Sequence, residues 1–325
     1  DSASKLSDKE ITLLKEWIAR GAKWKEHWTF ERVKRPVINA EGRHPIDALV
    51  NLRLAKENIK PNPRASRETL IRRLTLDLTG LPPTLEQINT FLADKEDGAW
   101  DRLVVRTLTS PGYGERMAWD WLEVARYADT NGYQGDRERT MWPWRDWVVQ
   151  AFNENLPYDQ FTIWQLAGDL LTDATQEQIL ATGFNRNHMI NGEGGRIAEE
   201  NRVDYVFDMT ETMGTVWLGL TLNCARCHNH KFDPISRSEY FQLTAFFNQT
   251  PVNGGGGDPQ AKPVLPAGTT AQNNELAQMR KNISDVRKEI ERRQQEQQDD
   301  QVKWENKVLS NPPAHAWKSL LPKEA

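Results

Sequence analysis

Hydrophobic positions along most of this chain recur every three or four residues, which is the period of an amphipathic helix. Residues 7–21 and 66–80 each combine such a stripe with a capping serine before it and a glycine after it. Thr84 and Gln87 predict another helix start. Further helices are predicted over residues 114–129, 143–153, 159–171, 175–184 and 199–220. Strand patterns are sparse, so the expected fold is mostly α, an irregular helical domain with long loops.

Three segments interrupt the helical pattern. Residues 129–144 and 185–200 are rich in glycine, asparagine and charged side chains, as functional loops often are. Residues 251–270 have the composition of a Gly/Pro linker. Beyond them, apolar residues in steps of three and four predict a coiled-coil-like helix over residues 271–310. So few apolar positions favour a C-terminal helical strut over a self-sufficient coiled coil.

Composition narrows the function classes. Charged residues make up 27% of the 325 residues and the net charge is −4, without a basic stripe, so nothing favours nucleic acid as a partner. No apolar run reaches the roughly 18 residues of a membrane span. The 13 tryptophans are more than such a chain usually carries, and core packing is the expected role for most of them.

The only two cysteines lie three residues apart and a histidine follows the second. The motif of Cys224, Cys227 and His228 is C-x-x-C-H, which is the attachment signature of c-type haem. Two thiols one helical turn apart can each add to a haem vinyl group, and the next imidazole then lies under the iron as its proximal ligand. The sequence therefore predicts haem c at these three residues.

Three other kinds of site can contain a cysteine pair of this spacing. A disulfide between Cys224 and Cys227 would close too short a loop to restrict the unfolded chain much. A thioredoxin-type redox pair requires a strand before it, whereas the preceding segment is predicted to be helical. A structural zinc site could use both cysteines with His228 or His230, but no second cysteine pair is present.

The sixth ligand of such a haem iron would be a methionine, a histidine or no side chain at all. His188 and Met189 are the candidates, because they lie in an irregular loop that can aim a ligand. Met209 and Met213 are expected to be core residues. His230 follows His228 so closely that a turn cap or a propionate contact is the expected role.

The loop of residues 129–144 has a composition that suits a ligand. Aromatic faces with carboxylates and guanidinium groups nearby can hold a sugar ring or grip an anion, and the same residue types can anchor a neighbouring domain. The candidate residues are Asp129, Tyr133, Asp136, Arg137, Arg139, Trp142 and Trp144.

Several long blocks also resemble a known family, the planctomycete-type cytochrome c domain, which is the second cytochrome-like module of large multidomain planctomycete proteins. The resemblance covers about residues 44–248. The blocks that carry it include "RRLTLDLTGLPPT", "MWPWRDWV", "LAGDLL" and "WLGLTLNCARCHNHKFDPISRSEYFQLTAFFN".

This resemblance implies a haem protein in the periplasm or another extracytoplasmic compartment, and a chain that is part of a longer protein. The expected organisation is a tail of an upstream cytochrome-like module (1–27), the helical domain with the C-x-x-C-H motif (28–250), the linker (251–270), the coiled-coil-like segment (271–310) and the start of a further segment (311–325).

The expected function is electron transfer to a redox partner protein, either as a relay or as the redox part of a carbohydrate-acting enzyme. Two alternatives stay open: a non-redox module that is stapled by zinc or binds carbohydrate, and a peroxidase-like haem enzyme with an open iron site. The residues do not decide whether the chain catalyses a reaction.

Overall fold

The computed structural model describes residues 6–24, 27–38, 42, 44–258, 260–268 and 270–311. Within these ranges every regular element is helical, and one isolated bridge between Thr130 and Glu138 is the extent of β pairing. The predicted mostly α fold is therefore confirmed. The expected further segment after residue 311 lies outside the described residues.

The chain divides into two compact units, residues 1–65 and 66–325. The first contains α1 (Asp8–Ala19), the short helix η1 (Trp28–Phe30) and α2 (Pro45–Lys56). The predicted capping box of Ser7 and Glu10 is present at the start of α1. Among the described residues of this unit, Ala48 alone is buried.

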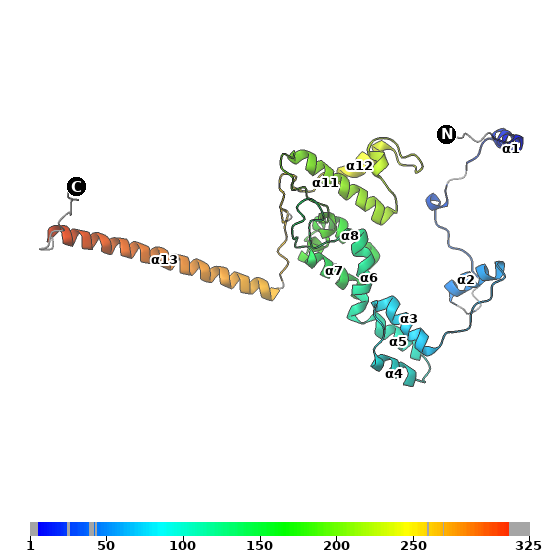
Figure 1. The fold of residues 1–325 in the computed structure, drawn as a ribbon, viewed down its shortest axis with the longest axis horizontal. Coiled ribbons are helices and arrows are strands. Elements are labelled where there is room, and N and C mark those ends of the chain that lie inside the picture. Colours follow the sequence, from blue (N-terminus) through cyan, green and yellow to red (C-terminus); the bar gives the residue numbers. More distant parts are fainter. Residues whose placement is uncertain are drawn as a thin grey trace, which may run out of the picture. The chain divides into compact units, whose positions relative to one another are not determined.

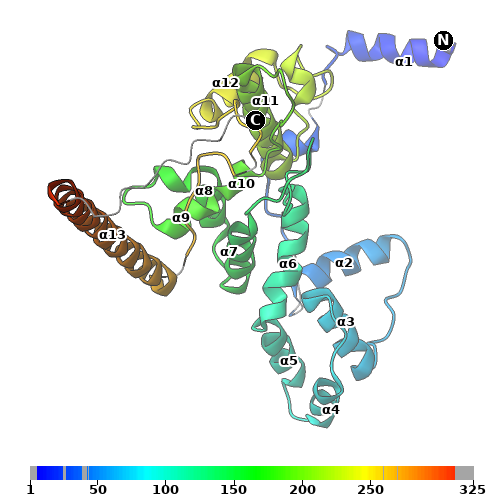
Figure 2. The same cartoon turned by 60° about the vertical axis from the view of Figure 1, so that its left-hand side comes forward.

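The second unit contains the remaining helices. In chain order they are α3 (Arg67–Thr79), α4 (Leu85–Ala93), α5 (Ala99–Leu108), α6 (Pro111–Val124), α7 (Trp142–Asn153), α8 (Tyr158–Ala167), η2 (Gly168–Leu170), α9 (Gln176–Ala181), α10 (Gly183–Arg186), α11 (Ala198–Met213), η3 (Gly214–Leu218), η4 (Asn223–Arg226), α12 (Arg237–Phe247) and α13 (Thr270–Ser310). Figure 1 and Figure 2 show α3, α4 and α5 gathered at one end of α6. The predicted caps Ser66 and Thr84 are both observed, and Gly80 ends α3 in the left-handed region.

A core rich in aromatic side chains joins the five helices from α6 through α10. Trp147 stacks on Phe161 with ring centroids 5.6 Å apart, and the buried Trp144 donates a hydrogen bond from Nε1 to the carbonyl of Ala181 at 3.0 Å. Each indole thus fills core volume while its N–H is satisfied. The tryptophans of this core are Trp121, Trp144, Trp147, Trp164 and Trp217.

Helix α11 is packed on two opposite faces. Tyr205 and Met209 belong to a core cluster that includes Ile190. Phe207 lies two residues after Tyr205, about 200° around the helix axis. It packs in a second cluster with Leu222, Ala225 and Tyr240. α11 therefore separates two small cores, which places the motif segment on one side and the loop of residues 185–197 on the other.

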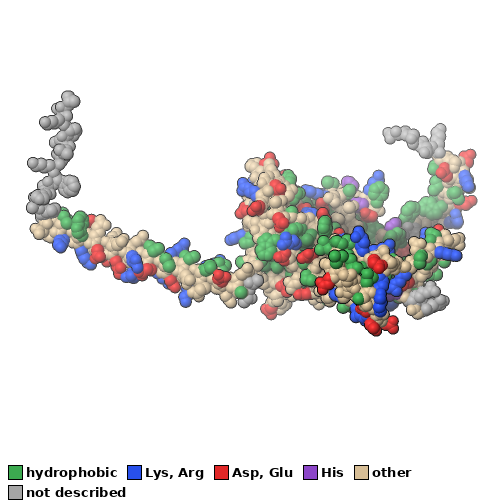
Figure 3. Space-filling model, turned by 60° about the horizontal axis from the view of Figure 1, so that its bottom comes forward, with side chains coloured by type: hydrophobic (Ala, Val, Ile, Leu, Met, Phe, Trp, Pro, Cys, Tyr) green, Lys and Arg blue, Asp and Glu red, His purple; other side chains and the backbone are tan. Residues whose placement is uncertain are grey.

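Helix α13 runs without a break through the polar stretch that follows its apolar stripe. Its apolar side chains stay roughly half exposed. Figure 3 shows acidic and basic side chains interspersed along it. The apolar stripe consists of Leu276, Met279, Ile283, Val286 and Ile290. Among the described residues, no helix is long and apolar enough to cross a membrane.

Candidate functional site

The C-x-x-C-H motif lies on the short helix η4 and the residues directly after it. Leu222 and Ala225 point into the core against Tyr240, and Ala225 is fully buried. The two thiols lie on the outside, where both are exposed and neither forms a disulfide. The alternation of buried and exposed positions therefore presents Cys224 and Cys227 to solvent from an anchored turn.

His228, which ends the motif, and His230, two residues later, have opposite hydrogen-bonding roles. His228 is exposed, and its Nδ1 donates to the carbonyl of Asn229 at 2.8 Å, which leaves the lone pair of Nε2 free. The Nδ1 of His230 instead accepts from the backbone N–H of Asp233 at 2.9 Å. A neutral His230 ring then carries its proton on Nε2 and has no free lone pair. His228 thus has a ring nitrogen with a free lone pair, whereas His230 is a turn cap, one of its two expected roles.

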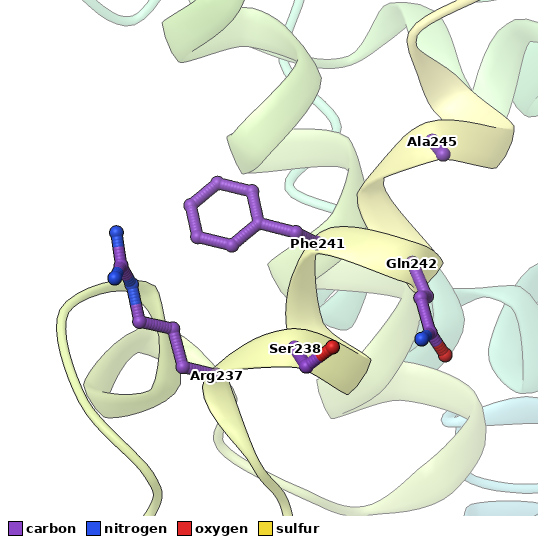
Figure 4. A pocket seen from close by; sticks show the side chains of 5 residues that line it. All are labelled: Arg237, Ser238, Phe241, Gln242 and Ala245. Carbon is purple, nitrogen blue, oxygen red and sulfur yellow. The ribbon is translucent and has the colours of Figure 1, made fainter.

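An arginine–aromatic stripe lies beside the motif. The guanidinium of Arg226, between the two cysteines, lies 4.1 Å from the ring centroid of Phe207. Phe207 meets Phe241 edge to face at 6.0 Å, and Arg237 lies 5.4 Å from the Phe241 ring. Figure 4 shows Arg237 and Phe241 extending from α12 at a shallow surface depression. Two phenylalanine rings therefore lie beside the residue between the two cysteines, with an arginine at each end, and Arg226 is paired with Asp204 at 2.9 Å.

The half-buried carboxylate of Glu211 is hydrogen-bonded to the residue that precedes the motif. Glu211 accepts one hydrogen bond from the hydroxyl of Tyr240 and one from the side chain of Asn223, both at 2.9 Å. Burial raises the pKa of Glu211 above its ordinary value. Asn223 directly precedes Cys224, so the carboxylate of Glu211 links α11 and α12 to the start of the motif. Nothing in the local sequence pattern marks Glu211, so this role was not predicted.

The two candidate distal ligands are placed differently. His188 is fully buried and stacks on Tyr205, on the face of α11 opposite to Phe207 and the motif. Its Nδ1 donates to the carbonyl of Met189 at 2.9 Å, and its Nε2 lies 3.2 Å from Nη1 of Arg186. Both ring nitrogens are therefore in use within the protein. Met189 is 46% exposed.

Met209 belongs to the core, as expected, at 2% exposure, and Met213 packs against the same cluster.

The predicted ligand loop has an exposed part and a buried part. Tyr133 and Trp142 are each 48% exposed, and Arg137 is exposed as well. Trp144 and Arg139 are buried, at 1% and 6% exposure. The Trp144 ring is enclosed by the aromatic core and has no face open to a ligand.

The two aspartates of this loop accept hydrogen bonds from residues close to them in the chain. Asp136 accepts from the backbone N–H of Gly132 at 2.8 Å, and Asp129 accepts from the hydroxyl of Tyr127 at 2.5 Å. Hydrogen bonds from Thr130 and Gly132 lower the pKa of Asp136.

The two irregular loops are bound to each other and to the segment expected as a linker. Arg139 Nη1 donates to the carbonyl of His188 at 3.0 Å. From the third segment, the carbonyl of Ala261 accepts from Arg186 at 2.5 Å, and Gln260 donates to Thr140 at 3.1 Å. Residues 251–258 and 260–268 therefore lie against the helical domain instead of standing apart from it. We call this meeting point of residues 129–141, 185–197, 253–258 and 260–261 the three-loop junction.

No group of three or more His, Cys, Asp or Glu side chains in the described ranges has the arrangement of a metal site. Neither a curated protein nor a solved structure matches the chain. Residues 45–252, which are more than half of the chain, match PSCyt2, described as a protein of unknown function (DUF1549). The chain therefore belongs to this planctomycete-associated domain family, PSCyt2.

Proposed function

We propose that the chain is a c-type haem protein that attaches haem through Cys224 and Cys227, uses His228 as the proximal iron ligand and transfers single electrons to a partner protein. The observation that carries the proposal is the hydrogen bond from His228 Nδ1 to the carbonyl of Asn229. Histidines that bind metals commonly donate their second ring N–H to a carbonyl, which fixes the tautomer and orients Nε2.

The side chains around the motif suit this group. The two exposed thiols are free to form thioethers, and Phe207 and Phe241 offer apolar surface to a flat macrocycle. Arg237 would offer a cation to one haem carboxylate, and Arg226, which is paired with Asp204 at 2.9 Å, lies at the other end of the stripe. Bound haem would supply one-electron redox chemistry whose potential depends on the iron ligands and the surrounding charges. The proposal includes the extracytoplasmic location that the family resemblance implies.

The decisive experiment is denaturing mass spectrometry of the chain after production in a periplasm that contains a haem-attachment system. We expect the polypeptide mass plus one haem, and the polypeptide mass alone for Cys224→Ser with Cys227→Ser. A chain with only its polypeptide mass and one bound zinc ion would contradict the proposal and favour the zinc-stapled alternative.

The two histidines provide a matched pair for the iron ligand. His228→Ala should lower haem attachment sharply and change the spin state of any product, because a strong-field nitrogen is lost. His230→Ala removes a turn cap and should leave the spectrum of the attached haem unchanged. Equal spectra for both variants would contradict the assignment of His228.

A second candidate function is a haem enzyme with an open iron site. The placement of His188 favours it, because both ring nitrogens are engaged on the far face of α11. Carbon monoxide distinguishes the two functions: rapid binding to the reduced protein would indicate an open site and catalysis, whereas no binding would indicate a carrier. In the second case, Met189→Ala tests the half-exposed thioether as the sixth ligand.

A carbohydrate-acting role rests on the exposed part of the ligand loop. Tyr133, Arg137 and Trp142 present two aromatic groups and a cation to solvent. Titration of the chain and of Trp142→Ala with neutral and acidic oligosaccharides, followed by tryptophan fluorescence, tests it. Absence of any saturable signal would remove sugars as partners of this loop.

A further inference from the structure

Three arginines converge on the three-loop junction from different elements. Arg126 follows α6, Arg139 belongs to the loop before α7, and Arg186 ends α10. Burial together with the nearby charges of Arg186 and Arg126 lowers the pKa of Arg139 to about 10. Arg139 and Arg186 meet at one residue, because Arg139 donates to the carbonyl of His188 and Arg186 lies 3.2 Å from its Nε2.

Acidic side chains compensate only part of this charge. Arg126 Nη1 donates to both carboxylate oxygens of Asp208. The negative charge of Asp258 raises the pKa of Arg186 and so stabilises its charged form. Arg139, at 6% exposure, has one hydrogen bond, to a backbone carbonyl. The negative charge of Asp208 also raises the pKa of Arg139, but this carboxylate is hydrogen-bonded to Arg126. Guanidinium groups stay charged in proteins, and a buried charge without a counter-ion of its own is costly.

His188 adds no charge to this cluster. Burial and the three neighbouring arginines lower its pKa to about 3, so its ring is neutral at physiological pH.

Several buried N–H donors of this cluster have no partner. Nε and Nη2 of Arg139 are unpaired, and so is Nε of Arg126. Nε and Nη2 of one guanidinium form the edge that binds two oxygens of an oxyanion side by side. Arg126 adds a third unpaired donor from a separate element, and an anion that bonds both arginines needs an oxygen outside the plane of that edge. A tetrahedral anion offers such an oxygen, whereas a planar carboxylate does not.

Asn187 lies between Arg186 and His188 in sequence. Its side-chain amide adds both a hydrogen-bond donor and an acceptor. It is 4% exposed, and neither its Nδ2 nor its Oδ1 has a hydrogen-bond partner. Buried polar groups are normally paired, so unpaired donors and an acceptor next to buried cations indicate a ligand.

We propose that the three-loop junction binds a tetrahedral oxyanion, sulfate or phosphate, either free or as an ester, with the unpaired edge of Arg139 as its main contact and Arg126 as its second. The proposal is independent of haem. The exposed side of the site is Arg126, whose side chain is 33% exposed.

The test compares the thermal stability of the full chain in sulfate, phosphate, acetate and chloride at matched ionic strength. Sulfate also stabilises proteins in general, because it is excluded from their surfaces. The variant Arg139→Met therefore supplies the reference, with Arg145→Met, a partly exposed arginine paired with Asp146, as the matched control. We expect saturable stabilisation by sulfate or phosphate in the wild type and in Arg145→Met. Arg139→Met should keep only the general, non-saturating part.

Equilibrium dialysis with radiolabelled sulfate and with radiolabelled phosphate gives the stoichiometry and identifies the anion that binds more tightly. One anion per wild-type chain, with at least a tenfold loss of affinity in Arg139→Met, supports the site. If Arg139→Met does not fold, Arg126→Met, which removes the second proposed contact, takes its place.

Three results would overturn the proposal: equal anion responses in the wild type and the junction variant, a response to acetate as large as that to sulfate, or no saturable binding of either tetrahedral anion to the wild type.

Discussion

The side chain of Asn131 is bound to the backbone of Ile190 by two hydrogen bonds: Nδ2 donates to the carbonyl at 2.6 Å, and Oδ1 accepts from the N–H at 2.9 Å. Both residues are buried, at 4% and 1% exposure. They lie 59 positions apart in the chain. This pair joins the two irregular loops, which are two of the three segments of the three-loop junction.

Replacement of this asparagine should be costly. Asn131→Ala leaves the buried N–H and carbonyl of Ile190 without partners, so we expect a loss of about 2–4 kcal/mol in the free energy of unfolding. Tyr133→Ala, in the exposed part of the same loop, is the control and should change it by less than about 0.5 kcal/mol. Urea unfolding followed by tryptophan fluorescence measures both. Equal losses would show that the loops are not joined through Asn131.

The buried His188 should make the protein sensitive to acid. Burial lowers its pKa from 6.5 to about 3, so the unfolded chain binds one proton more than the native state between these values. Stability contributed by the neutral ring is therefore present above pH 6.5 and is lost as the pH falls toward about 3.

The variant His188→Gln, which cannot take up this proton, should lose less stability than the wild type across that interval. His228→Gln changes an exposed histidine and is the control in chain without haem. Parallel stability curves for the wild type and His188→Gln would contradict the prediction.

The packing beneath the motif should control haem attachment. Ala225 is fully buried between the two cysteines, so Ala225→Leu overfills its site and should destabilise the fold by about 1–3 kcal/mol. We expect a fall in the fraction of chain that carries haem, because the turn that presents both thiols is displaced. Lys231→Leu adds the same side chain at an exposed position and should leave attachment unchanged; mass spectrometry compares the two.

The half-buried Glu211 should lower the free energy of unfolding as the pH rises. Burial raises its pKa above 4.5, so the native state binds more protons than the unfolded chain from pH 4.5 up to the native pKa. The free energy of unfolding therefore falls across that window, and the full penalty is present above it.

Two variants test this dependence in opposite directions. Glu211→Gln should remove it. Tyr240→Phe removes a hydrogen bond that lowers the pKa of Glu211, so it should widen the window. Unfolding measured at several pH values in each variant checks the sign, and identical profiles would contradict this role of Glu211.

The sequence by itself determined many of the helical elements and many of their ends, because helix caps act within a few residues. Ser66 and Gly80 bound α3, and the pair of Thr84 and Gln87 starts α4, as predicted. α5 was not predicted: Gly98 precedes it and no side chain caps its first turn. α12 was also missed, although Ser236 with Glu239 forms a capping box that marks its start.

The motif too could be identified from sequence, since its spacing is the signal. Which of the two histidines has a free ring lone pair depends on the local backbone conformation, which places the carbonyl of Asn229 at His228 and the N–H of Asp233 at His230. The burial of Trp144 and the placement of His188 behind α11 depend instead on contacts with distant helices. Periodicity tells which residues share a face of α11, but only packing decides what each face meets, because that depends on segments tens of residues away.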